Sequence, residues 1–260
     1  MALIKTAEDI DAIIVGGKRL GEVLERLIPF VVPGVSSEEL NAYAMKWIEE
    51  KGDKASFHGY TPDGAPRPYP AALCVSVNEE VVHGIPNENP RILQDGDIVT
   101  LDCGLIHKGR FVDSALSLPV GNVEQRYMDL MKATQESLEA AIRVVLPGKH
   151  VGDIGAAIID SVQDSPFGIV QELGGHGVGH AVHEEPYIPN VGDSGEGEEL
   201  LEGMVIAIEP ILVEGSPRVK LLKDGYTYVT KDGRRAAHFE HTMVVTSGGP
   251  RVVTRRPSEL

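Results

Sequence analysis

The chain has 260 residues, of which 42% are hydrophobic and 24% are charged. This is globular composition with enough material for a full core, and two cysteines, Cys74 and Cys103, exclude a disulfide framework. The net charge of −15 argues against an average surface that binds nucleic acid or anionic membrane. No apolar run approaches the ~18 residues of a membrane span, so we expect a cytoplasmic protein with no membrane partner.

Two helices are predicted at the start of the chain. Apolar residues recur at helical spacing over residues 7–31, and the Pro-Gly pair at 33–34 ends that pattern. Ser36 or Ser37, followed by two glutamates, is typical of the cap of a second helix. Gly52 is placed to end this second helix.

The middle of the chain predicts a loop followed by strands. The stretch "TPDGAPRPYP" at 61–70 has four prolines, which no helix or central strand tolerates. Strand-like stretches follow at 72–77 and 97–104, and 110–120 pairs with the latter through the turn "IHKGR". Helices are expected over 123–145 and 151–162, with strands and glycine-rich turns in the rest.

The two halves of the sequence share a repeated pattern. "QDGDIVTLD" (94–102) and "LEGMVIAIE" (201–209) both place a carboxylate six residues after a glycine, downstream of a helix, a Pro-Gly break and another helix. We interpret 1–260 as a single domain with duplicated halves of about 1–120 and 121–260, in which Asp102 and Glu209 face each other. Chance similarity of amphipathic patterns is the alternative.

Four carboxylates lie in apolar, strand-like stretches. Glu209 stands inside "VIAIEPIL", and Asp102, Asp113 and Glu240 occupy "DIVTLDCGL", "RFVDSALSL" and "HFEHTMVVT". An unpaired buried charge is costly unless it is paired or binds metal. His176 in "GGHGVGH" is a fifth candidate, because its four glycines allow close approach of the backbone.

Each of these residues has an ordinary structural explanation when it is taken alone. Asp113 could accept hydrogen bonds in a turn, Glu240 could pair with Arg234 or Arg235, and His176 could be a structural histidine. Together, however, four carboxylates and one histidine form an oxygen-rich set that suits two divalent ions such as Mn, Fe or Co. Hydrolysis is the reaction class that uses such a pair of ions.

The quoted stretches, with "NEEVVHGIP" (78–86), "GGHGVGHAVHEEP" (174–186) and "FEHTMVVT" (239–246), give the chain a specific resemblance. Along nearly its full length it resembles the type I methionine aminopeptidases. The resemblance implies the pita-bread fold, an α/β (α+β) architecture with two pseudo-symmetric halves around a central, curved, antiparallel-rich sheet. It also implies two divalent ions (Co, Mn or Fe) and five ligands: Asp102, Asp113, His176, Glu209 and Glu240.

The roles of these residues follow from the same resemblance. Asp113 and Glu240 would bridge the ions, whereas Glu209 would also relay a proton. His83 and His183 would stand unliganded beside the substrate. The implied reaction removes the N-terminal methionine from nascent proteins and peptides with a small second residue, through a water or hydroxide that bridges the metals.

The resemblance also implies the walls of the methionine pocket: Tyr60, Tyr69, Cys74, Val182 and Tyr226. A second reading of Cys74, as a small buried hydrophobe, stays open. Val182 and Tyr226 stand where many relatives have larger aromatic residues, and eight residues (61–68) separate Tyr60 from Tyr69. We therefore expect a different pocket rim and a wider pocket.

A basic stretch interrupts the acidic chain. Residues 218–235 carry six lysines and arginines and resemble the loop by which some bacterial relatives touch the ribosome. A solvated hairpin is the alternative. We expect a monomer, since no oligomer interface is suggested.

Other members of the pita-bread group share the ligand set. X-Pro aminopeptidases and prolidases usually carry a large N-terminal domain, and only about 80 residues precede His83. Type II methionine aminopeptidases have an insertion between the corresponding positions, whereas here Glu209 follows His183 by only 26 positions. A non-catalytic binding protein would lose ligands, and a metal-storage protein would not need His83 and His183.

Overall fold

The structure is a computed structural model that describes residues 4–62 and 64–260. Its helices are α1 (Ala7–Leu27), α2 (Ser37–Glu49), α3 (Gln125–Arg143) and α4 (Val151–Val162), with 3-10 turns η1 (Ile28–Phe30) and η2 (Pro257–Glu259). The strands of the first half are β1 (Lys54–Ala55), β2 (Leu73–Val77), β3 (Glu80–Val82), β4 (Ile98–His107) and β5 (Arg110–Pro119). Those of the second half are β6 (Gly168–Ile169), β7 (Gly174–Gly177), β8 (Glu184–Pro189), β9 (Val205–Ile208), β10 (Ile211–Val213), β11 (Val219–Leu221), β12 (Tyr228–Thr230), β13 (Ala236–His238), β14 (Glu240–Val244) and β15 (Arg251–Val252).

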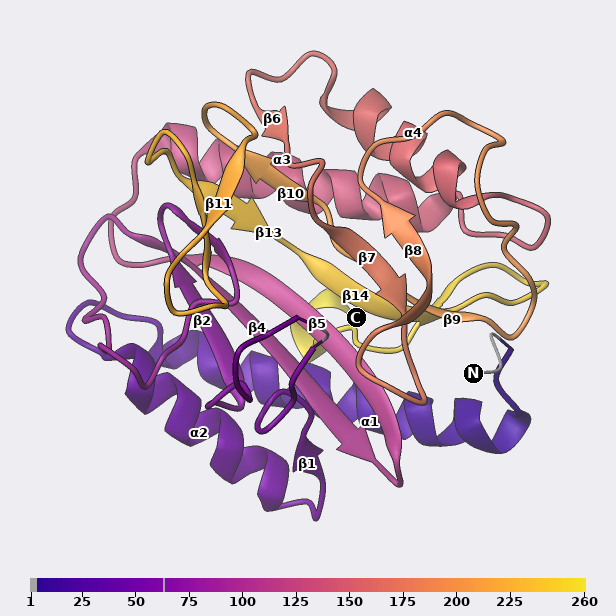
Figure 1. The fold of residues 1–260 in the computed structure, drawn as a ribbon, viewed down its shortest axis with the longest axis horizontal. Coiled ribbons are helices and arrows are strands. Elements are labelled where there is room, and N and C mark those ends of the chain that lie inside the picture. The colour runs from indigo at the N-terminus through magenta and orange to yellow at the C-terminus, as the bar shows by residue number, and fades with distance from the viewer. Residues whose placement is uncertain (1–3, 63) are drawn as a thin grey trace.

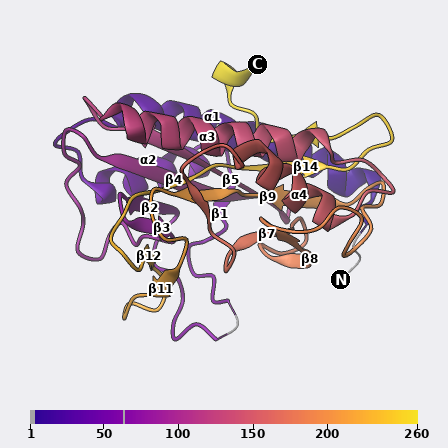
Figure 2. The ribbon, with the colours of Figure 1, turned by 90° about the horizontal axis from the view of Figure 1, so that it is seen from above.

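A nine-stranded sheet forms the middle layer (Figure 1). Its order is β1-β4-β5-β14-β9-β7-β8, with β2 also paired to β4 and β15 to β14. Figure 2 shows α1 and α3 along one side of this sheet, and the separate strands β11 and β12 on the other. These helices therefore cover one face of the sheet, so a functional site on the sheet would lie on the opposite face.

The predicted helices form, with shifted ends. The Ser36 hydroxyl accepts a hydrogen bond from the Glu39 N–H, and the Glu39 carboxylate accepts one from the Ser36 N–H, so the expected cap is a full capping box. The first helix ends at Leu27 rather than at residue 31, and a 3-10 turn containing Pro29 follows. Apolar spacing continues through this turn, but proline cannot donate to an α-helical ladder.

The other elements follow the predictions closely. The strand expected over 97–104 runs on to His107, because it pairs along its whole length with β5. The prediction for 61–70 is confirmed, since no described residue there belongs to a helix or strand. No helix in the described part of the chain has the length and apolarity needed to cross a bilayer.

Both halves contribute two helices and antiparallel strands to the common sheet. The first half supplies the β4–β5 hairpin, and the second supplies β9 and β14, which pair with each other. β5 joins β14 where the halves meet. Descent of the halves from one repeated unit stays a prediction.

Candidate metal centre

The pairing register places three of the predicted ligands on one face of the sheet. Asp102 on β4 and Glu240 on β14 both lie opposite Ala115, from the two sides of β5. Asp113 stands two residues before Ala115 on the same strand. Since side chains alternate along a strand, Asp113 and Ala115 point to the same side. The small methyl group of Ala115 leaves room for the three carboxylates to meet.

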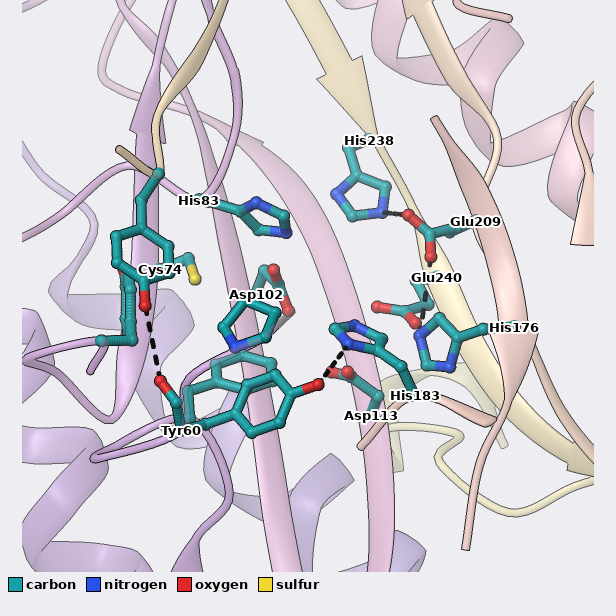
Figure 3. A pocket seen from close by; sticks show the side chains of 14 residues that line it. Tyr60, Cys74, His83, Asp102, Asp113, His176, His183, Glu209, His238 and Glu240 are labelled. Carbon is teal, nitrogen blue, oxygen red and sulfur yellow. Dashed lines mark hydrogen bonds and ion pairs between the residues drawn. The ribbon is translucent and has the colours of Figure 1, made fainter. Parts of the chain in front are cut away.

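The same reasoning adds His176 and Glu209. His176 on β7 lies opposite Ala207, and Ala207 lies opposite Thr242. Glu209 follows Ala207 by two residues, and Glu240 precedes Thr242 by two. All five predicted ligands line one cavity (Figure 3). The structure therefore brings together side chains from four strands and from the end of a fifth element, β9.

The ligand atoms suit a cation. One ligand atom from each of Asp113, His176 and Glu240 lies within 4.8 Å of the other two. Asp102 Oδ1, Asp113 Oδ1 and Glu240 Oε1 are buried and have no hydrogen-bond partner among the described residues. Buried acceptors without partners are rare in folded proteins. These atoms therefore fit metal ions, which would supply the missing positive charge.

The electrostatics of the four carboxylates support this fit. Burial raises the pKa of Asp102 to about 7. Burial, together with neighbouring carboxylates, raises the pKa values of Asp113, Glu209 and Glu240 well above their ordinary range. Burial and mutual repulsion thus disfavour the ionised form of these carboxylates, and a bound cation would stabilise that form.

His176 is oriented for a ligand role. Its Nδ1 lies 2.8 Å from the Gly177 carbonyl oxygen, so Nδ1 carries the proton and Nε2 keeps its lone pair. Burial, and to a smaller extent His183, lowers the pKa of His176 to about 3. The expected close approach of the backbone is confirmed, since a Cβ on Gly175 would meet the Ala207 carbonyl oxygen at 2.2 Å.

The two other predicted histidines line the same cavity. His83 follows β3 with φ of +58°, an uncommon backbone conformation for a side-chain-bearing residue. Burial, then the neighbouring His183, lowers the pKa of His83 to about 4. His183 lies at the solvent-exposed mouth, where its Nδ1 is 3.1 Å from the Tyr60 hydroxyl.

A fourth histidine in the cavity was missed by the sequence reasoning. His238 is 2% exposed, its Nε2 lies 3.7 Å from Glu209 Oε2, and neither ring nitrogen has a hydrogen-bond partner among the described residues. Figure 3 shows it between His83 and Glu209. Its place two residues before Glu240 in "HFEH" was the available signal, because alternate residues of an extended chain share a face.

An apolar, aromatic wall borders the carboxylates. Tyr60, Tyr69, Cys74 and Tyr226 line the cavity together with Phe57 and Pro62, which the sequence did not single out. Tyr69 and Tyr226 meet edge to face at 5.1 Å between ring centroids. Val182 packs in the same apolar cluster but is not among the lining residues, so its role in the pocket stays a prediction.

The 61–68 segment is tied to this wall. The Tyr226 hydroxyl donates to the Arg67 carbonyl oxygen and lies 3.5 Å from that of Tyr60. Pro62 reaches the cavity from this segment. The expected difference at the rim thus falls on described residues, except for Asp63, which lies outside them.

A second, more open cavity continues from the carboxylates. His83, His176, His183 and Glu209 line both cavities, and Leu173 and Tyr187 border only the open one. A polypeptide could therefore pass from solvent across the carboxylates, with its first side chain against the aromatic wall.

Comparison with known proteins identifies the family of the chain. The model of metallopeptidase family M24 matches residues 12–247. A methionine aminopeptidase of Aquifex aeolicus is 43% identical over 95% of this chain and 96% of its own. The chain belongs to the methionine aminopeptidases of metallopeptidase family M24.

Solved structures agree with membership in this family. The crystal structure of a methionine aminopeptidase from Thermotoga maritima has a TM-score of 0.92 and 38% identity, and covers 97% of this chain and 99% of its own. An Xaa-Pro dipeptidase from Bacillus anthracis shares the fold with a TM-score of 0.75, 23% identity and 99% of this chain, but only 63% of its own. The predicted pita-bread fold is thus confirmed.

Proposed function

We propose that this chain removes the N-terminal methionine from nascent proteins and peptides with a small second residue, using two divalent ions (Co, Mn or Fe). The observation that carries the proposal is the meeting of five candidate ligands on one face of the sheet, beside a cavity walled by aromatic rings and a thiol. Aromatic and sulfur groups make favourable contacts with a thioether side chain. Membership in the M24 methionine aminopeptidases points to the same reaction.

The proposed ion ligands are Asp102, Asp113, His176, Glu209 and Glu240. When bound, the ions would make a water molecule more acidic and polarise the scissile carbonyl. The partnerless oxygens of Asp102, Asp113 and Glu240 support this assignment. The identity and number of the ions are part of the proposal.

The remaining steps use side chains of this chain. The Glu209 carboxylate would take a proton from the attacking water and pass it to the leaving amine. Since the Tyr60 hydroxyl lies beside His183 Nδ1, we assign the proton of His183 to Nε2, which would donate to the substrate carbonyl oxygen. His83, on the open side, would orient the leaving amide.

The two cavities suggest why the enzyme would act only at chain ends. The methionine side chain would fill the closed cavity, while the rest of the peptide would leave through the open one. The free α-amine would then stand among the buried carboxylates, where an internal peptide bond has no positive charge to offer. A small second residue would pass most easily between His83 and His183.

The test measures methionine released from Met-Ala-Ser by metal-stripped protein, before and after addition of Mn, Co or Fe, with Gly-Pro-Ala as the parallel substrate. Metal-dependent release from Met-Ala-Ser alone is expected. Turnover of the proline peptide alone would move the chain to the X-Pro class. No turnover with any metal would refute an enzymatic role.

We further propose that the segment 218–235 contacts the ribosome. Arg218, Lys220, Lys223 and Lys231 are exposed along β11, β12 and their turns. Arg235 is engaged elsewhere, since its guanidinium lies 3.8 Å from the centroid of the Tyr127 ring. The exposed cations suit the phosphates of ribosomal RNA. A monomeric state and a cytoplasmic location stay predictions.

Co-sedimentation with ribosomes at two salt concentrations tests this contact. The double variant Lys220→Glu/Lys223→Glu is expected to leave the ribosomal pellet while it cleaves Met-Ala-Ser normally. Lys18→Glu/Lys46→Glu changes the net charge equally at exposed positions of α1 and α2. Equal loss of binding in both variants would indicate net charge rather than this segment.

A further inference from the structure

The segment before and at the start of α1 lies against the turn that carries His183. Lys5 Nζ lies 2.6 Å from Glu184 Oε2, although 179 residues separate the two in sequence. The Lys5 side chain is 1% exposed and that of Glu184 is 3% exposed. A charge pair buried this completely is strongly destabilised when one partner is removed, because the other charge is left alone.

Glu184 also holds the turn together from inside. Its Oε1 accepts hydrogen bonds from the backbone N–H groups of Ala181, at 2.7 Å, and of His180. One carboxylate therefore closes residues 180–184 into a loop, and His183 is the residue directly before it. The position of the His183 backbone depends on this carboxylate.

Lys5 is itself fixed by its surroundings. Its backbone N–H donates to the Gly203 carbonyl oxygen at 2.9 Å, just before β9. Its side chain crosses Gly179, where a Cβ would lie 2.6 Å from Lys5 Cε. A second tie joins the same segments, because His180 Nε2 lies 3.1 Å from Asp9 Oδ2. Lys5 is thus held both at its backbone and along its side chain.

We propose that Lys5 is a positioning residue for the peptidase reaction, which holds His183 at the mouth of the active site through Glu184. The inference rests on the proposed function of His183 as a donor to the substrate. Lys5 is not among the residues that line either cavity, whereas His183 and Glu184 line the open one, so Lys5 would act through the turn. A displacement of the His183 ring by about 1 Å is enough to lower turnover substantially.

The first experiment replaces Lys5 by methionine, which keeps the length of the side chain and removes its charge. The value of kcat/KM for Met-Ala-Ser is expected to fall by about tenfold to a hundredfold, mainly through kcat. Lys5→Arg should restore most of the activity. If Lys5→Met does not fold, Lys5→Met/Glu184→Gln leaves no charge buried alone and is expected to fold with the same loss.

Arg19→Met is the matched control. Arg19 also pairs with a buried carboxylate, Asp53, at 2.8 Å, but its hydrogen bonds go to Lys51, Asp53 and His107 rather than to the His183 turn. It lines neither cavity. This variant is expected to lose thermal stability and to keep its kcat/KM per folded molecule. If Lys5→Met behaves in the same way, the positioning role is refuted.

A double-mutant cycle separates positioning from general stability. In a His183→Ala background, Lys5→Met should lower the Tm as before but should cause no further loss of kcat/KM, because the group that it positions is gone. An equal loss in both backgrounds would overturn the proposal.

A readout without turnover keeps this test independent of the proposed function. In protein labelled with ¹⁵N-histidine, Lys5→Met is expected to shift or broaden the ring signals of His183, whereas Arg19→Met leaves them in place. If wild-type protein releases no methionine with any metal, the proposed function fails, and the His183 signals still test whether Lys5 positions the His183 ring. Unchanged signals in Lys5→Met would refute it.

Discussion

The two walls of the active-site cavity differ in how their polar atoms are satisfied. On the aromatic side each tyrosine hydroxyl has a partner: Tyr60 meets His183, Tyr69 donates to the Gly84 carbonyl oxygen at 2.9 Å, and Tyr226 donates to that of Arg67. On the carboxylate side Asp102, Asp113 and Glu240 each keep a buried oxygen without a partner among the described residues.

This difference separates what is complete in the protein alone from what needs another component. The aromatic side has its hydrogen bonds already and can only select a side chain by shape. The carboxylate side is fixed by strand register but lacks positive charge, so its chemistry depends on cations. Changes on the two sides should therefore alter different observables.

The largest expected effect is on the stability of the metal-free protein. Burial raises the pKa of Asp102 from 3.8 to about 7, so the folded state binds a proton that the unfolded state has released between these values. That contribution is fully present below pH 3.8 and is lost as pH rises through about 7. Asp102 alone should therefore lower the unfolding free energy by an amount on the order of 4 kcal/mol across this window. The buried neutral histidines His83, His176 and His238 act in the opposite direction below pH 6.5, because their pKa values are lowered in the folded state.

Urea unfolding at pH 5, 6, 7 and 8, with and without Mn²⁺, measures this decline. The metal is expected to abolish it, since a cation favours the ionised carboxylate. In the absence of metal, Asp102→Asn should lose the part of the decline that Asp102 contributes, whereas Asp113, Glu209 and Glu240 keep theirs. Equal pH dependence of the metal-free stability in wild-type protein and in Asp102→Asn would contradict the contrast between the two walls.

The next effect is on metal binding and activity. Glu240→Gln keeps the shape of the side chain and removes its charge. We expect kcat/KM to fall by more than about 100-fold, because even residues that only orient metal ligands are worth about 10- to 100-fold. Metal content by mass spectrometry should fall in parallel, whereas metal-free stability should stay equal or rise.

Glu136→Gln, at an exposed position of α3, is the control for loss of one negative charge. It should keep both its metal content and its activity. Full metal occupancy in Glu240→Gln would remove Glu240 from the ligand set.

The smallest effect is expected on the aromatic side. Tyr226→Phe removes the hydrogen bond to Arg67 and releases the segment that carries Pro62 into the cavity. One hydrogen bond corresponds to about a threefold to tenfold rise in KM for Met-Ala-Ser, with little change in kcat. Tyr43→Phe, on α2 and outside both cavities, is the control. A fall in kcat with unchanged KM would show that this wall is not a separate recognition surface.

Much of the site was predictable because it depends on local chemistry. A carboxylate inside an apolar strand, such as Glu209 or Asp102, can be recognised from its neighbours in sequence. The glycines around His176 likewise indicate close backbone approach. Helix starts were predictable for the same reason, since a cap such as Ser36 acts on residues only three positions away.

Other features were set by contacts that no local pattern carries. The hydrogen bond from Tyr226 to Arg67 joins residues 159 positions apart in sequence, and the Lys5–Glu184 ion pair joins residues 179 positions apart. The extent of β4 to His107 was also underestimated, because its last residues are held by pairing with β5 rather than by their own propensity.

The sequence by itself determined the elements, the donor set and, through its resemblance, the family. Each of these depends on side-chain chemistry over a few residues, which the order of amino acids states directly. The tertiary structure alone decided which face of the sheet the five ligands share and which N-terminal lysine pairs with Glu184 beside His183. Those outcomes depend on strand register and on buried charge pairing between distant segments, which exist only once the chain is folded.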